Sequence, residues 1–255
     1  MQAKKHVLSI AGLDPSAGAG ILSDIKTFEA HKVFGLGVCS CITFQNELKI
    51  NGVSWISAEE IIKQLEPLFA QYLIDYVKIG LIQNGSTLEN LTNYLLKKNP
   101  KIKIMWDPIL QASSGFIFHD GFERIFLYEL SQKLFLITPN TQEITRLMPD
   151  ESTAGACEKL SKYCSVLLKG GHTTEEDCTD QLYTKGIITN IKSKRLQSEK
   201  HGTGCVLSSS ITANLANGLT LEDACTSAKQ YVFKFLESDP GLVGQHSYEN
   251  AKIYS

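Results

Sequence analysis

The chain has 255 residues, with 25 Lys and Arg against 27 Asp and Glu, so its formal net charge at pH 7 is −2. This balance excludes the broad basic surface on which nucleic-acid binding depends, so nucleic acid is not an expected partner. The first residues contain no apolar stretch long enough for a signal peptide or a membrane span. We therefore expect a cytoplasmic protein that acts on a small molecule and has no membrane partner.

Seven cysteines stand at irregular spacing, without a paired Cys-x-x-Cys set. The pattern indicates neither a disulfide framework nor a structural zinc site. No repeat, low-complexity tract or linker-like stretch divides the chain, and single α/β domains of about 200–250 residues are common. We expect one domain that spans residues 1–255.

Short apolar runs alternate with helical patterns along the chain. The runs typical of strands covered on both faces are residues 7–10, 36–43, 76–79, 102–106, 134–137 and 166–168. Two pairs, Ser57 with Glu60 and Ser86 with Glu89, match the capping box that opens a helix. The alternation predicts right-handed crossovers and a doubly wound, mostly parallel sheet with helices on both faces.

The pattern changes after residue 171. Residues 180–184 and 187–195, joined by Lys185-Gly186, predict an antiparallel hairpin at one edge of the sheet. Two helices close the chain, and the first of them begins near Thr203 and ends before Gly218, a typical C′ glycine.

Polar residues and glycines follow six expected strands, at the ends that meet at one edge of a parallel sheet. They are Gly12-Leu13-Asp14, Gln45-Asn46, Gly80, Asp107-Pro108, Thr138-Pro139-Asn140 and Lys169-Gly170-Gly171-His172. Most of these residue types are ordinary turn formers, which is the alternative interpretation. Gln45 and Lys169 are not turn formers, so we interpret this edge as a ligand site.

The segment His201-Gly202-Thr203-Gly204-Cys205 leads directly into an expected helix. Two glycines around Thr203 allow successive backbone N–H groups to point at one spot at the helix N-terminus, where an anion such as a transferring phosphoryl group is stabilised. Cys205 falls in the first turn, a position that favours the thiolate. The alternative for Cys205 is a small buried apolar residue.

The glycine-rich stretch from Gly12 to Gly20 follows the first strand. It has no Walker lysine, and Ser23 stands where a dinucleotide fingerprint requires its third glycine. The stretch instead fits the wall of a small-substrate pocket, with Asp24 facing the ligand. The alternative for Asp24 is a solvent-exposed acid near the positive end of a helix.

Two acidic residues are candidate metal ligands. Asp107 ends a mainly apolar strand, and Glu143 lies three residues after Asn140 at the start of a helix. Mg²⁺ bound to nucleotide phosphates takes only one or two carboxylates, so this pair suffices. For Glu143, capping of the helix is the alternative.

Taken together, these motifs resemble the hydroxymethylpyrimidine/phosphomethylpyrimidine kinases of thiamin biosynthesis, which have the ribokinase-like fold. Eight segments carry the resemblance in order over nearly the whole chain: residues 10–20, 24–28, 45–46, 78–80, 107–108, 138–140, 169–172 and 201–205. The resemblance implies an ATP- and Mg²⁺-dependent homodimer that phosphorylates 4-amino-5-hydroxymethyl-2-methylpyrimidine and then its monophosphate.

The resemblance also implies a role for each site residue. Gln45 would pair with the aminopyrimidine edge, because an amide offers a donor and an acceptor. Lys169 would neutralise the transferring phosphate, and Cys205 holds the position of the catalytic base. The remaining expected contacts are Gly202, Thr203 and Gly204 in the anion hole, Asp107 and Glu143 at the metal, Asn140, Lys169 and Thr203 at the nucleotide, and Gly12, Ala19, Asp24, Leu81 and Ile109 at the substrate.

Two other functions are compatible with these motifs. One is a pyridoxal kinase of the same superfamily, or an enzyme that serves both substrates. Gln45 and Lys169 favour the pyrimidine, because related pyridoxal-active members often lack both. The other is a non-catalytic sensor of pyrimidines or nucleotides. The presence of four residues argues against a sensor: Asp107, Lys169, Thr203 and Cys205.

Overall fold

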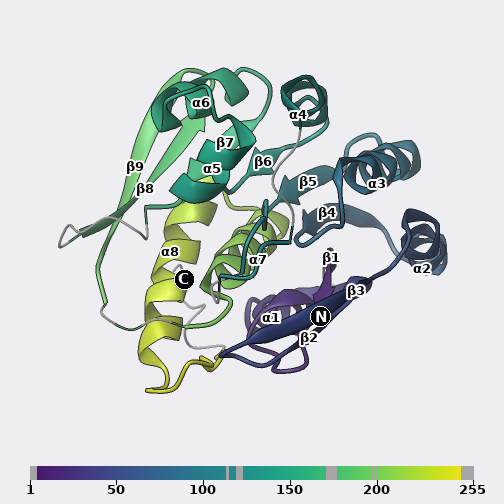
Figure 1. Cartoon of the computed structure of the whole chain (residues 1–255), viewed down its shortest axis with the longest axis horizontal. Helices are drawn as coiled ribbons and strands as arrows, with labels where there is room; N and C mark the ends of the chain where they lie inside the picture. Colours follow the sequence, from purple (N-terminus) through teal and green to yellow (C-terminus); the bar gives the residue numbers. More distant parts are fainter. Residues whose placement is uncertain are drawn as a thin grey trace.

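The computed structural model describes residues 5–112, 115–118, 123–170, 177–196, 198 and 200–247. Within these ranges one sheet has the strand order β3-β2-β1-β4-β5-β6-β7-β8-β9 (Figure 1). The strands are β1 (His6–Leu13), β2 (Phe34–Gln45), β3 (Ile50–Trp55), β4 (Ile74–Ile79), β5 (Lys103–Trp106), β6 (Leu136–Ile137), β7 (Ser165–Leu168), β8 (Asp177–Thr184) and β9 (Ile187–Lys194).

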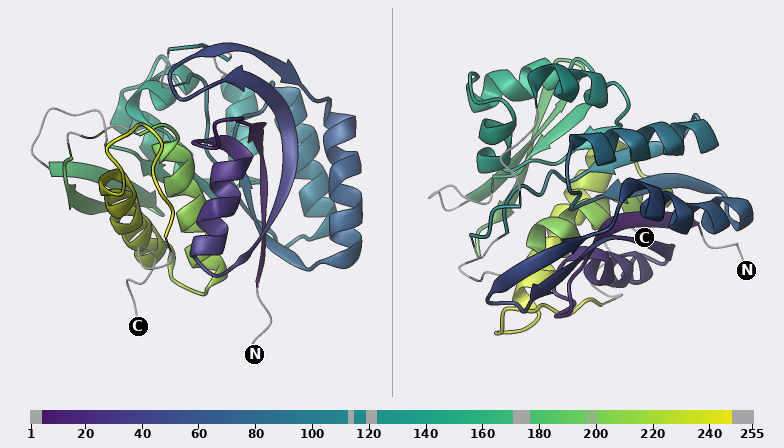
Figure 2. Two further views of the ribbon diagram at one scale, coloured as in Figure 1. Left: turned by 90° about the horizontal axis from the view of Figure 1, so that it is seen from below. Right: turned by 45° about the vertical axis from the view of Figure 1, so that its right-hand side comes forward.

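Helices cover both faces of this sheet. They are α1 (Gly20–Ala30), α2 (Ala58–Gln71), α3 (Gly85–Lys98), α4 (Arg124–Ser131), α5 (Thr141–Leu147), α6 (Thr153–Leu160), α7 (Thr203–Ala216) and α8 (Leu221–Glu237). The alternation of side chains along β1 separates the two cores, because Leu8 and Ile10 pack with α2 and α3 whereas Val7 packs with α1 and α7. In the left view of Figure 2 the purple α1, the green α7 and the yellow α8 stand side by side.

The strand directions confirm the predicted sheet. Strands β2, β1, β4, β5, β6 and β7 pair in parallel, and β8 and β9 form the antiparallel hairpin at one edge. Strand β3, which the sequence pattern did not predict, pairs antiparallel with β2 at the other edge. Its Asn51 and Gly52 are poor strand formers, so pairing with β2 rather than local propensity makes this segment a strand.

The helix starts agree with the capping patterns at one site and differ at another. Ser57 and Glu60 form the predicted capping box of α2. The predicted box of Ser86 and Glu89 is wrong, because α3 begins at Gly85 and its N-cap is Asn84, which accepts a hydrogen bond from the N–H of Thr87 at 2.9 Å. The observed N-cap thus lies two residues before the predicted one, and an asparagine side chain satisfies a free amide of the first turn as a serine would.

Backbone hydrogen bonds continue the parallel ladder past the strand ends. The N–H of Gly80 donates to Ile10 O, that of Asp107 to Ile79 O, and that of Lys169 to Pro139 O, each at 2.8–2.9 Å. These bonds align the residues after β4, β5 and β7 along one edge. Across the described residues, no helix combines the length and the apolar character needed to span a bilayer.

Candidate active site

A cavity of about 900 Å³ opens at this edge of the sheet. It lies where a doubly wound sheet binds its ligands, outside the carboxyl ends of the strands. Of the residues singled out from the sequence, its wall contains Gly12, Ala19, Gln45, Leu81, Asp107, Ile109, Asn140, Glu143, Lys169, Gly202, Thr203, Gly204 and Cys205. Gly171 and His172, at the end of one predicted motif, lie outside the described residues.

The ammonium of Lys169 lies between two carboxylates. Its Nζ is 2.9 Å from Asp107 Oδ1 and 3.4 Å from Glu143 Oε2. Burial alone would lower the pKa of Lys169, but the two carboxylates raise it above its ordinary value, so the side chain stays charged. Asp107 also accepts hydrogen bonds from the hydroxyls of Thr138 (3.0 Å) and Ser208 (3.2 Å).

Glu143 forms the helix cap that was the alternative interpretation of this residue, and it also reaches the cavity, while its role as a metal ligand stays a prediction. Its Oε2 accepts the N–H of Asn140 at 2.7 Å, and its own N–H donates to Asn140 Oδ1 at 2.8 Å, which completes a capping box at the start of α5. The same carboxylate contacts Lys169 in the cavity. Burial raises the pKa of Glu143 above its ordinary value.

The N-terminus of α7 is shaped by two glycines. Gly202, the N-cap, has φ of +79°, and a Cβ there would stand 2.0 Å from Gly18 O, so only glycine fits. A Cβ on Gly204 would stand 3.5 Å from Lys169 Nζ and 3.9 Å from Asp107 Oδ2. The first turn of α7 therefore lies directly against the lysine.

Within the described part of the chain, no side chain caps the amides at this helix end. Gly202 carries no side chain, and the hydroxyl of Thr203 donates to Lys200 O at 2.7 Å. The positive end of the helix dipole thus faces the cavity beside Lys169, an arrangement that binds anions. The structure brings the predicted anion-hole residues and the lysine together, and their roles in phosphoryl transfer stay predictions.

The expectation of a thiolate at Cys205 is wrong. Burial raises the pKa of the thiol to about 11, and the nearby charge of Lys78 and the N–H of Gly20 offset only part of that rise. The free-energy cost of desolvating the thiolate here is larger than the stabilisation that the positive N-terminus of the helix gives it. Cys205 is 6% exposed and lines the cavity, so its resting form is a neutral thiol at the site.

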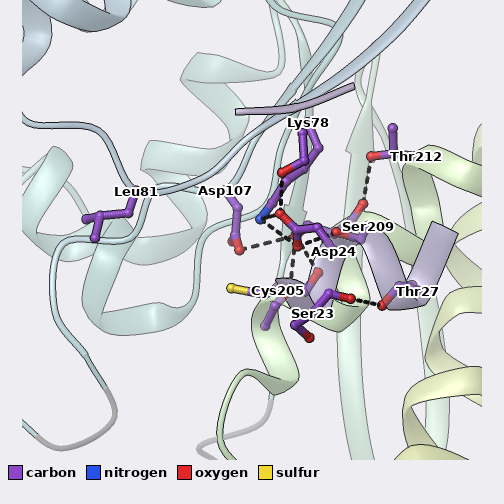
Figure 3. A network of polar contacts seen from close by, with 12 residues as sticks. Ser23, Asp24, Thr27, Lys78, Leu81, Asp107, Cys205, Ser209 and Thr212 are labelled. Carbon is purple, nitrogen blue, oxygen red and sulfur yellow. Dashed lines mark hydrogen bonds and ion pairs between the residues drawn. The ribbon is translucent and has the colours of Figure 1, made fainter. Parts of the chain in front are cut away.

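The structure does not place Asp24 in the cavity wall, and both interpretations of this residue from the sequence need correction. Its side chain is fully buried and pairs with Lys78, with Nζ–O distances of 3.0 and 2.8 Å. Figure 3 shows the carboxylate of Asp24 close to Lys78 and Ser209. A buried charge of this kind needs a partner, and Lys78, on β4, supplies it.

Asp14 and His201 form a pair that the sequence did not single out. His201 Nε2 lies 2.8 Å from Asp14 Oδ2, and both residues line the cavity. Burial alone would raise the pKa of Asp14, but hydrogen bonds from His201, from Ser16 and from the N–H of Ala19 hold it well below its usual range. Asp14 belongs to the glycine-rich stretch after β1, and His201 belongs to the segment before α7. These two segments lie far apart in the sequence, and only the fold brings them together.

Gln45 has an unsatisfied acceptor. Its side-chain amide helps to hold the pKa of Asp14 low, and because an ionised carboxylate only accepts, Nε2 is the atom of Gln45 that faces Asp14. Gln45 Oε1 is buried and has no hydrogen-bond partner among the residues that the structure describes. Buried polar atoms are rarely left unpaired, so this oxygen on a cavity-lining residue indicates a ligand donor.

Comparisons with known proteins show the family to which the chain belongs. Residues 14–249 match the family described as phosphomethylpyrimidine kinase. A hydroxymethylpyrimidine/phosphomethylpyrimidine kinase of Staphylococcus aureus (strain MRSA252) is 33% identical over 251 residues, covering 93% of this chain and 90% of its own. The crystal structure of phosphomethylpyrimidine kinase from Clostridium difficile 630 is 31% identical, with a TM-score of 0.76, and the match covers 91% of this chain and 99% of that one.

The fold extends to other vitamin kinases. A structure of pyridoxal kinase from Staphylococcus aureus in complex with pyridoxal has a TM-score of 0.83 over 98% of this chain and 96% of its own, at 23% identity, which shows the fold alone. The same enzyme has been solved with ADP and with AMP-PCP. The resemblance seen in the sequence motifs is confirmed: the fold is ribokinase-like, and the chain belongs to the phosphomethylpyrimidine kinase family of phosphotransferases.

Proposed function

We propose that this chain uses ATP to phosphorylate 4-amino-5-hydroxymethyl-2-methylpyrimidine, and then phosphorylates the monophosphate to the diphosphate, in thiamin biosynthesis. The observation that carries the proposal is the meeting of Lys169 Nζ with the first turn of α7 in one cavity that also contains Gln45. The names of the relatives and the nucleotide complexes of the pyridoxal kinase support both the substrate and the donor.

Lys169 and the N-terminus of α7 would stabilise the transferring phosphoryl group. During transfer, charge spreads over the equatorial oxygens of the γ-phosphoryl group, and catalysis consists mainly of positioning and charge neutralisation. Lys169 is held charged by its two carboxylates, and the amides at residues 203–205 point from a helix N-terminus. These groups are already ordered, so no reorganisation is needed at the moment of reaction.

Gln45 would recognise the pyrimidine ring. The exocyclic amine of the substrate can donate to the unpartnered Oε1 of Gln45, whose Nε2 is already engaged with Asp14. Gly12, Leu81 and Ile109 line the same cavity and would contact the ring. A site with a buried acceptor of this kind discriminates strongly against analogues that lack the matching donor.

Asp107 and Glu143 would hold the Mg²⁺ that the family implies. The described part of the chain has no cluster of three or more His, Cys, Asp or Glu side chains. Mg²⁺ in kinases instead takes one or two carboxylates together with phosphate oxygens and waters, and two carboxylates beside the anion site fit that requirement. When bound, the ion would neutralise charge on the nucleotide phosphates.

The test is ADP release with three acceptors: the hydroxymethylpyrimidine, its monophosphate and pyridoxal. We expect turnover with both pyrimidines, and loss of at least about a hundredfold in both for Lys169→Met, because each step moves the same γ-phosphate. Turnover of pyridoxal with none of the pyrimidines would overturn the proposal. Ligand binding without ADP release would make the protein a sensor.

We also propose that residues 1–255 act as one domain in a cytoplasmic homodimer. Support for a second copy comes from Ile42, Phe44 and Leu48, which are apolar and 41–66% exposed at one end of β2. Such grouped apolar side chains are typical of contact surfaces. Light scattering coupled to gel filtration should give twice the chain mass, and Phe44→Asp should shift it toward the monomer.

A further inference from the structure

Helix α7 is buried on all sides. Every residue from Cys205 to Ala216 is buried, and serines, alanines and threonines make up much of its surface. Its Leu207, Ile211 and Leu215 pack into the apolar core on one side, so their burial sets the approximate rotation of the helix about its axis. On its other faces α7 carries small polar side chains, and because hydrogen bonds have a defined geometry, these contacts fix that rotation more closely.

Three consecutive serines supply these contacts. Ser208 Oγ donates to Asp107 Oδ2 at 3.2 Å, and Ser209 Oγ donates to Asp24 Oδ1 at 2.6 Å. Ser210 Oγ lies 2.8 Å from Nε2 of His31, the C-cap residue of α1. Successive residues of a helix point about 100° apart, so the three hydroxyls hold α7 from three directions. All three serines are at most 1% exposed.

The acceptor of the Ser209 hydrogen bond, Asp24, belongs to a buried ion pair with Lys78. Asp24 accepts Lys78 Nζ at 3.0 and 2.8 Å, Ser9 Oγ at 2.5 Å and Ser209 Oγ at 2.6 Å, so it joins β1, β4, α1 and α7 (Figure 3). Both charged side chains are fully buried. Burying such a pair costs desolvation energy that its own attraction only roughly repays, so it contributes little net stability.

We propose that the Lys78–Asp24 ion pair is a positioning device for phosphoryl transfer, which acts through Ser209 to fix the rotation of α7. The inference rests on the proposed function, because the groups it aims are Cys205 and the amides at residues 203–205. Neither Lys78 nor Asp24 lines the cavity. They therefore act through the helix and not on the substrate.

The lever is short. Ser209 stands six residues beyond Thr203, which is about 9 Å along the helix axis. Between them lies Ser208, which ties the same helix to Asp107 beside Lys169. A change of α7 rotation moves the anion hole relative to the lysine, and misplacement of reacting groups by about 1 Å can cost about a hundredfold in rate.

The first test is Ser209→Ala, with Thr212→Val as its matched control. Thr212 is fully buried on the same helix, but its hydroxyl donates only to Ser208 O within α7, at 2.8 Å. We expect Ser209→Ala to lower kcat at least about tenfold, with KM for both substrates changed by less than about threefold, as for loss of an interaction realised in the transition state. Thr212→Val should keep kcat within about threefold of wild type.

The second test separates positioning from stability. Asp24→Ala alone leaves Lys78 as an uncompensated buried charge and should lower the melting temperature strongly, whereas Asp24→Ala with Lys78→Met removes both charges and should recover most of that loss. We expect the double variant to show a loss of kcat as large as that of Ser209→Ala, because in both proteins Ser209 no longer hydrogen-bonds to Asp24. Wild-type kcat in a folded double variant, or equal losses in Ser209→Ala and Thr212→Val, would overturn the proposal.

A readout without substrate distinguishes this proposal from the proposed function. Hydrogen exchange in the peptide that covers residues 203–210 should be faster in Ser209→Ala than in wild type and unchanged in Thr212→Val, because only the first loosens the start of α7. If the wild type phosphorylates no pyrimidine, the proposed function fails while this comparison still decides the positioning role. Identical exchange rates in Ser209→Ala and Thr212→Val would contradict the positioning role of the ion pair.

Discussion

Gly204 lies directly against Lys169: a Cβ on the glycine would stand 3.5 Å from the lysine Nζ. One residue belongs to the first turn of α7 and the other follows β7, so a helix N-terminus and an ammonium converge at one point of the cavity. Both favour negative charge, and the space between them is where a migrating phosphoryl group would be stabilised.

Gly204→Ala should abolish most activity without unfolding the protein. The added methyl group meets no atom closer than 3.5 Å, so it fits, but it occupies the space beside Lys169. We expect kcat to fall about a hundredfold with an unchanged melting temperature. Gly202→Ala is the contrast, because its methyl group would stand 2.0 Å from Gly18 O and should destabilise the fold. Wild-type kcat in Gly204→Ala would place the phosphoryl path elsewhere.

Cys205→Ala should slow phosphorylation of the alcohol about a hundredfold and that of the monophosphate much less. The alcohol must lose a proton, whereas the phosphate acceptor is already ionised at neutral pH. Because burial raises the pKa of Cys205 to about 11, the thiolate fraction grows as the pH rises. The wild-type rate with the alcohol should therefore increase with pH up to about pH 11, and Cys205→Ala should lack this increase. Equal losses in both steps would make Cys205 a positioning residue.

Gln45→Met should weaken recognition of the pyrimidine. The variant keeps the side-chain volume but removes the buried acceptor Oε1 and the donor to Asp14. Loss of one such hydrogen bond corresponds to about tenfold in kcat/KM for the pyrimidine. The KM for ATP serves as the internal control and should not change. An unchanged kcat/KM for the pyrimidine would remove Gln45 from the ring site.

His31 should make the fold sensitive to acid. Burial lowers the pKa of His31 from 6.5 to about 4, and the neutral ring contacts Thr27 O through Nδ1 (2.9 Å) and Ser210 Oγ through Nε2 (2.8 Å). Between these pKa values the unfolded chain binds more protons, so stability is complete above about pH 6.5 and falls toward pH 4.

The free energy of unfolding should accordingly drop by about 2 kcal/mol from this one residue between about pH 7 and pH 4.5. Urea unfolding at the two pH values measures it, with His31→Gln as the variant that cannot titrate. The variant should show a smaller drop than the wild type. The same pH dependence in both proteins would show that His31 is not the titrating group.

Much of the fold followed from local patterns, and the exceptions have identifiable causes. The parallel strands and the edge hairpin were predicted because buried strands are continuously apolar. Strand β3 was missed because its Asn51 and Gly52 are weak strand formers and only β2 makes it a strand. The start of α3 was misplaced because Asn84 and Ser86 both offer a cap and only the backbone decides between them.

The candidate site was predicted mostly from topology. Residues after parallel strands share one edge wherever they occur in the chain, which is why Gln45, Asp107 and Lys169 could be grouped without coordinates. The environment of Asp24 could not be predicted, because its ion-pair partner Lys78 lies 54 residues away in the sequence and only the fold buries the two side chains together. The protonation of Cys205 was mispredicted for the same reason: its position favours the thiolate, but its burial depends on packing of α1 against α7.

The most direct test of the account is a crystal structure with a non-hydrolysable ATP analogue, Mg²⁺ and the hydroxymethylpyrimidine. The distances to measure run from the γ-phosphoryl oxygens to Lys169 Nζ and to the amides of residues 203–205, and from the ring amine to Gln45 Oε1. The account predicts hydrogen-bond contact in all three cases. A γ-phosphoryl group bound away from Lys169 and α7 would contradict it.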